Sequence, residues 1–113
     1  MANIGILGAG SWGLGLAMLL NNNGHDVTVW SVFPDEIKEL DETRENKRCL
    51  PGVIFPEHIK FNADTEYVVK NSDVLVLAVA SPYTRSTAKI IAPFVKEGQY
   101  IVCLLYTSDA ADE

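Results

Sequence analysis

Short apolar runs of strand composition alternate along the chain with segments that carry helix signals. The runs expected to form strands are Asn3–Leu7, Asp26–Trp30, Ile59–Asn62, Asp73–Ala80 and a stretch that begins at Tyr100. The segments expected to form helices are 12–22, 34–46, 64–70 and 82–95, each opened or closed by Pro, Asp, Asn or Gly. Strands that alternate with helices in this way indicate an α/β domain.

The longest apolar run, DVLVLAVA at 73–80, indicates which kind of sheet to expect. Its residues do not alternate between apolar and polar, as they would in a strand with one solvated face, so it predicts a strand covered on both faces. A crossover helix between the first two strands makes them parallel. The pattern therefore predicts a doubly wound, mainly parallel Rossmann-type sheet with helices on both faces.

The composition predicts one water-soluble domain and limits its partners. Of 113 residues, 48% are hydrophobic and 21% are charged, as in ordinary globular proteins. The net charge of −6, with no cluster of Lys and Arg, argues against nucleic acid and anionic membranes as partners. The N-terminus predicts neither a signal peptide nor a membrane span, and Cys49 and Cys103 are expected to be free thiols, so we expect a cytoplasmic protein.

The segment GAGSWG follows a predicted strand and opens a predicted helix, and it matches the pattern GxGxxG. In this context the pattern predicts the binding of a dinucleotide pyrophosphate. Gly8 permits a tight turn, Gly10 lets the backbone approach the phosphates, and Gly13 lets the helix pack close to the strand. The alternative is that these glycines only form a sharp strand-to-helix turn.

Five more residues are candidates for cofactor binding. Ser11 is a candidate to donate to a phosphate oxygen and to cap the helix, two compatible roles. Trp12 lies either over the cofactor or against the sheet edge. After the second strand, the position where an acid would bind the ribose of NAD holds Ser31. Phe33 either stacks on adenine or packs the loop. Ser81, which follows the longest strand, either approaches the nicotinamide half or only belongs to a turn.

Other polar residues do not form a catalytic or metal-binding pattern. Asp35 lies at about the right distance from the glycines to bind ribose, but its place after Pro34 favours a role in starting the helix. Neither His25 nor His58 stands in a sequence pattern that indicates catalysis or metal binding. We therefore predict neither catalytic residues nor a metal site in this chain.

Four segments in a fixed order resemble a known family. They are IGILGAGSWG followed by LA, then NNGHDVTVWS, ETRENKRCLPGV and SDVLVLAV. Over residues 3 to about 102 the chain resembles the N-terminal domain of bacterial NAD(P)-dependent glycerol-3-phosphate dehydrogenase. The resemblance implies hydride transfer between sn-glycerol 3-phosphate and dihydroxyacetone phosphate with NAD or NADP, as an entry to phospholipid synthesis. It also implies a small-molecule substrate for the full-length parent and leaves a homo-oligomer of that parent open.

The resemblance also assigns residues. Ser11 and Trp12 match positions of the family that contact the cofactor, and Val32-Phe33 replace its usual His/Arg pair, so the choice between NAD and NADP stays open. The family's Ser-Lys-Gly, whose lysine reaches cofactor and substrate, has no counterpart at Cys103–Tyr106. We therefore expect the chain to bind cofactor without catalysing the reaction. The alternative function is a free-standing regulatory Rossmann module that senses NAD(H).

The last eleven residues, CLLYTSDAADE, do not continue the resemblance. They can be encoded by a nucleotide string that resembles a transposase adapter used in preparing sequencing libraries. The sequence therefore predicts a dinucleotide-binding domain over 1–102, a non-native tail over 103–113, and no C-terminal substrate domain.

Overall fold

Within residues 2–45, 52–79 and 81–103, which the computed structural model describes, five parallel strands form one sheet in the order β3-β2-β1-β4-β5. The strands are β1 (Asn3–Leu7), β2 (Asp26–Trp30), β3 (Lys60–Phe61), β4 (Val74–Leu77) and β5 (Tyr100–Cys103). The helices are α1 (Ser11–Asn22), α2 (Pro34–Thr43), α3 (Thr65–Lys70) and α4 (Ser81–Ile91), the last followed by the 3-10 turn η1 (Ala92–Phe94). The predicted doubly wound, parallel fold is confirmed.

Two buried clusters lie on opposite faces of the sheet. Ile6 of β1 packs with Leu14 of α1 and Leu40 of α2. Leu7, the next residue of β1, packs instead with Val69 of α3 and with the last residue of α4. Because successive side chains of a strand point to opposite faces, α1 and α2 cover one face and α3 and α4 cover the other.

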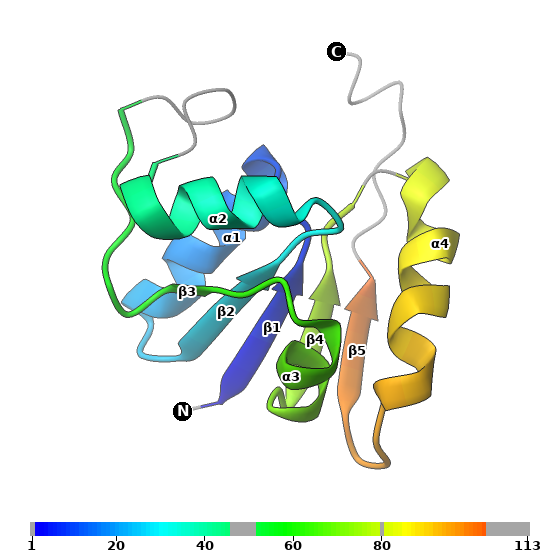
Figure 1. The fold of residues 1–113 in the computed structure, drawn as a ribbon. Coiled ribbons are helices and arrows are strands. Elements are labelled where there is room, and N and C mark those ends of the chain that lie inside the picture. The colour runs from blue at the N-terminus through cyan, green and yellow to red at the C-terminus, as the bar shows by residue number, and fades with distance from the viewer. Residues whose placement is uncertain (1, 46–51, 80, 104–113) are drawn as a thin grey trace.

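All strands run in the same direction, so their carboxyl ends lie at one edge of the sheet. β1 pairs with β2 on one side and with β4 on the other, with Ile4 opposite Val27 and Ile6 opposite Val76. Figure 1 shows the arrowheads of β1 and β4 at the same edge, where α1 and α4 begin. This edge positions the candidate site.

Helix α2 ends three residues earlier than predicted, at Thr43. The reason is Arg44, whose left-handed backbone (φ 61°) cannot continue a right-handed helix. Its guanidinium donates to the carbonyl oxygens of Phe55, Pro56 and Ile59, so the side chain ties the end of α2 to the loop before β3. Arg44 therefore holds residues 55–59, which precede β3, against the end of α2.

Two other predicted elements are also shorter in the structure. The predicted helix over 82–95 ends at Ile91, where the chain tightens into η1, which contains Pro93. A proline removes the backbone N–H that the next helical turn needs. β4 ends at Leu77, three residues before the predicted end, although the N–H of Ala78 still donates to the carbonyl of Leu7 at 2.9 Å.

The fifth strand differs most from the buried strand that its apolar sequence suggests. All four residues of β5 are exposed, including Tyr100 at 72% and Val102 at 44%. β5 lies at the end of the strand order, with β4 as its one neighbour among the described residues. Of the residues predicted to form a tail, 103–113, Cys103 is the last residue of β5, and those from Leu104 on lie outside the described part of the chain.

Candidate functional site

The candidate site lies where the chain changes direction across the sheet. From β1 the chain runs outward through β2 to β3, and it then crosses back to β4 on the other side of β1. The turns that follow β1 and β4 are therefore neighbours, and Leu7 lies opposite Leu77 at their start. In doubly wound sheets, ligands bind in the crevice at such a switch point.

Gly8 forms the tight turn directly after β1. Its φ is +133°, a conformation that side chains other than glycine rarely adopt, and a Cβ atom there would lie 2.4 Å from the carbonyl oxygen of Ala78. Its N–H donates to the carbonyl of Trp30 at 2.7 Å, which joins the turn to the end of β2. The turn after β1 is therefore fixed to both neighbouring strands.

Gly13 and Gly10 differ in what surrounds them. A Cβ atom on Gly13 would lie 2.1 Å from the carbonyl oxygen of Gly8, so the protein itself requires glycine there. A Cβ atom on Gly10, by contrast, would meet no atom within 4 Å, and Gly10 is exposed. Close backbone contacts within the turn explain why Gly8 and Gly13 are glycines. No such contact explains the glycine at position 10, which has open space beside it.

The N-terminus of α1 is suited to an anion. The N-cap residue is Gly10, which makes no side-chain capping bond, and the first turn holds no acidic residue. The first turns of the neighbouring helices differ, because α2 begins with Asp35 and Glu36 and α3 is capped by Asp64. The positive dipole end of this twelve-residue helix is therefore not offset by a carboxylate of the same turn.

Ser31 directly follows β2, as predicted, but its hydroxyl is already bonded. The residue is 5% exposed, and its Oγ donates to Oε1 of Glu36 at 2.9 Å and accepts from the N–H of Phe33 at 3.1 Å. The Phe33 side chain is 64% exposed, so it does not pack the loop. Asp35 lies in the first turn of α2, as expected, and is exposed. The sequence did not identify Glu36 as part of this site.

Trp12 lies on the outer side of α1. It is 60% exposed and lines a shallow apolar groove of about 370 Å³ with Gly15, Leu16 and Leu19. The indole therefore does not lie buried against the sheet. For Ser11 and Ser81 the described part of the structure is the backbone, which places them as the first residues of α1 and α4 at the same edge.

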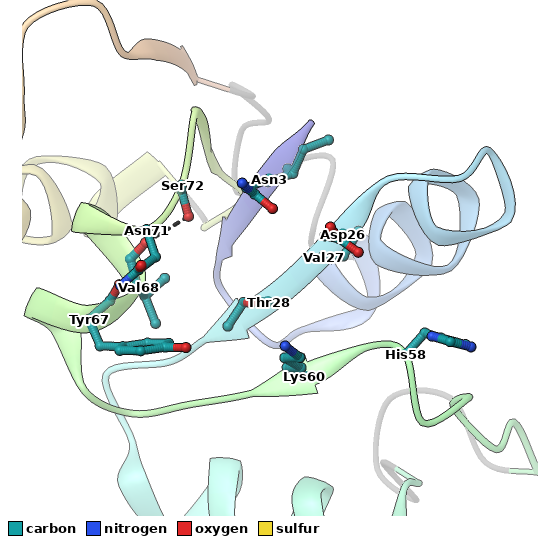
Figure 2. Close-up of a pocket in the computed structure, with 11 residues that line it drawn as sticks. Asn3, Asp26, Val27, Thr28, His58, Lys60, Tyr67, Val68, Asn71 and Ser72 are labelled. Carbon is teal, nitrogen blue, oxygen red and sulfur yellow. Dashed lines mark hydrogen bonds between the residues drawn. The ribbon is translucent and has the colours of Figure 1, made fainter. Parts of the chain in front are cut away.

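A second cavity lies at the opposite edge of the sheet, near the amino ends of the strands (Figure 2). Its volume is about 220 Å³, and β1, β2, β3 and α3 contribute to it. Its polar lining includes Asn3, Asp26, Thr28 and Lys60 from the sheet and Tyr67 from α3. None of the predicted site residues lines it, so it is separate from the glycine turn.

The described residues offer no other chemical centre. Among them, no group of His, Cys, Asp and Glu is arranged to hold a metal ion. Cys103 is an exposed free thiol, whereas Cys49 lies outside the described residues. In the part of the chain that is described, every helix is too short or too polar to cross a membrane.

Comparison with known proteins places the whole described domain in one family. Residues 3–106 match the family model described as NAD-dependent glycerol-3-phosphate dehydrogenase N-terminus. The chain is 55% identical over 104 residues to a glycerol-3-phosphate dehydrogenase (NAD(P)+) of Agathobacter rectalis, and 48% identical over 102 residues to one of Lactobacillus delbrueckii. These matches cover 92% and 90% of this chain but 31% and 30% of the relatives, so the chain spans about a third of their length.

Solved structures give the same result. The crystal structure of a glycerol-3-phosphate dehydrogenase from Coxiella burnetii superimposes with a TM-score of 0.87 at 30% identity, and the match covers 92% of this chain and 32% of that one. A yeast glycerol-3-phosphate dehydrogenase superimposes with a TM-score of 0.80 at 18% identity, over 92% of this chain and 33% of that one, which supports the fold alone.

Proposed function

Because the chain belongs to the NAD-dependent glycerol-3-phosphate dehydrogenase family, we propose that its described residues form a dinucleotide-binding domain that binds NAD(H) or NADP(H). The pyrophosphate lies against the turn between β1 and α1. The adenosine half extends toward the end of β2, and the nicotinamide half extends toward the turn between β4 and α4. This orientation follows the general arrangement of doubly wound folds.

The observation that carries the proposal is the difference among the three glycines. Gly8 and Gly13 have protein atoms where a Cβ would stand, whereas Gly10 has open space. A phosphate can approach the backbone at Gly10 because no side chain intervenes. The first turn of α1, whose N-cap Gly10 makes no side-chain capping bond, then supplies amide donors and the positive end of a helix dipole.

The remaining candidate residues take supporting roles in this proposal. In this proposal Ser11, the first residue of α1, donates to a phosphate oxygen. The exposed aromatic side chains of Trp12 and Phe33 contact the cofactor, and Ser81 lies near its nicotinamide half. When bound, the nicotinamide ring supplies a hydride donor or acceptor. The chain's own residues bind and orient it.

We further propose that the reaction served is that of the relatives whose names the comparisons give. It interconverts sn-glycerol 3-phosphate and dihydroxyacetone phosphate and so feeds glycerophospholipid synthesis in the cytoplasm. The support is the 55% identity to a glycerol-3-phosphate dehydrogenase across 92% of the chain. That family match favours a dehydrogenase domain over a free-standing regulatory module.

The test is a titration of the purified 113-residue chain with NADH and with NADPH. Cofactor binding predicts a saturable change in nicotinamide fluorescence with at least one of them, displaced by an excess of NAD+ or NADP+. If neither cofactor gives a saturable change, the chain does not bind a nicotinamide dinucleotide and the proposal fails.

A further inference from the structure

The end of β2 is tied directly to the glycine turn. The N–H of Gly8 donates to the carbonyl of Trp30 at 2.7 Å, and Ser31 is the next residue along the chain. A bound dinucleotide with its pyrophosphate at Gly10 therefore has the end of β2 close to its adenosine half. In doubly wound folds, groups at this position contact the ribose 2′ substituent, which is a hydroxyl in NAD and a phosphate in NADP.

A carboxylate reaches this position from the following helix. Glu36 lies in the first turn of α2, five residues after Ser31, and is partly buried. Its Oε1 accepts a hydrogen bond of 2.9 Å from Ser31 Oγ, and the same Oγ accepts one of 3.1 Å from the N–H of Phe33. The serine hydroxyl thus holds the carboxylate of Glu36 within hydrogen-bond distance of the strand end.

The local charge opposes a second phosphate. Between Ser31 and Ile37 the sequence contains two acids, Asp35 and Glu36, and no Lys or Arg. The positive dipole end of α2 would attract a 2′-phosphate, but these two acids stand in its first turn and offset it. A phosphate monoester carries a charge of about −1.5 to −2 at neutral pH, so it is repelled by a carboxylate a few ångströms away.

We propose that Glu36, positioned by Ser31, makes the chain prefer NAD(H) over NADP(H). The carboxylate accepts a hydrogen bond from the 2′-hydroxyl of the adenosine ribose and repels a 2′-phosphate at the same place. This inference rests on the proposed function, because it concerns the choice of cofactor at that same site.

The experiment compares the dissociation constants of NADH and NADPH for the 113-residue chain and two variants. Glu36→Gln removes the charge but keeps an oxygen that accepts the bond from Ser31, so the fold should be retained. Glu39→Gln makes the same change on an exposed position of α2, one turn further along, and is the matched control. Thermal unfolding checks that both variants are folded.

The chain itself should bind NADH more tightly than NADPH. In Glu36→Gln we expect the ratio of the two dissociation constants to fall by roughly tenfold or more, since a charge-assisted hydrogen bond and a repulsion are both removed. Glu39→Gln should leave the ratio unchanged.

Two results would overturn the inference. One is that the unaltered chain binds NADPH more tightly than NADH. The other is that neither Glu36→Gln nor Glu39→Gln changes the ratio of the two dissociation constants while NADH still binds. Either result leaves the proposed function standing. If the unaltered chain binds neither cofactor, the proposed function and this inference fail together.

Discussion

A Cβ atom on Gly13 would lie 2.1 Å from the carbonyl oxygen of Gly8, so the start of α1 and the end of β1 pack in backbone contact. The two glycines are five residues apart and belong to the same turn. Their contact sets how closely the N-terminus of α1 approaches the sheet. The proposed phosphate position depends on this approach, because Gly10 lies between them.

This contact predicts a loss of stability on substitution. Gly13→Ala should lower the free energy of unfolding by about 1–3 kcal/mol or more, because the methyl group must displace backbone. Gly15→Ala is the matched control on the same helix, since a Cβ there meets no atom within 4 Å, and it should raise the stability by about 0.5–1 kcal/mol. Urea unfolding measures both. Equal stability of the two variants would contradict the described packing of α1.

The two sides of α1 should respond differently to the loss of a leucine side chain. Leu14 is fully buried against the sheet, and Leu19 is 56% exposed. Leu14→Ala should cost about 2–5 kcal/mol, whereas Leu19→Ala should change the stability by about 0.5 kcal/mol or less. Urea unfolding midpoints and slopes measure the difference, and a larger cost at Leu19 would show that the buried face of α1 is assigned wrongly.

The two tryptophans report on cofactor binding separately. Trp12 is 60% exposed, whereas Trp30 is 3% exposed and its Nε1 donates to the carbonyl of Ala63 and to Thr65 Oγ1. Because the cofactor is proposed to lie against Trp12, saturating NAD+ should reduce the quenching of tryptophan fluorescence by acrylamide. The Trp12→Phe variant retains only Trp30 and should show weak quenching with or without NAD+. Unaltered quenching of the parent chain at saturating NAD+ would remove Trp12 from the proposed site.

The cavity at the amino edge of the sheet should not take part in cofactor binding. Lys60 contributes an exposed ammonium group to its rim (Figure 2). If the pyrophosphate binds at the turn after β1, Lys60→Ala should leave the NADH dissociation constant unchanged within error. A loss of tenfold or more in affinity, on the order of 1.4 kcal/mol, would indicate that this cation holds the phosphates instead.

The sequence predicted the sheet well because its strands are short apolar runs between clear turn signals. β1 and β2 have the predicted bounds. The ends of α2 and α4 were wrong because they depend on particular backbone events, the left-handed Arg44 and the tightening before Pro93. The exposure of β5 depends on its position at the edge of the sheet, which composition does not reveal.

The candidate site was predicted in part. The GxGxxG pattern located the turn and assigned an expected role to each glycine. The structure adds that a Cβ atom would meet backbone at Gly8 and Gly13 but no atom within 4 Å at Gly10. The sequence has Ser31 and no acid directly after β2, and it does not show that the carboxylate of Glu36 reaches Ser31 from the next helix. A signal was available: Pro34 opens a helix, so residue 36 lies in its first turn, near the end of the strand.

The central claim is that a dinucleotide phosphate approaches the backbone at Gly10, and two matched variants test it most directly. Gly10→Ala and Gly15→Ala each add one methyl group to α1 or its N-cap, at positions where a Cβ meets no protein atom within 4 Å. The measurement is the NADH dissociation constant of each folded variant. We predict that Gly10→Ala weakens binding by about tenfold or more while Gly15→Ala leaves it unchanged, since only the first methyl group would stand between backbone and phosphate. Equal affinity of Gly10→Ala and the parent chain would contradict the proposed position of the cofactor.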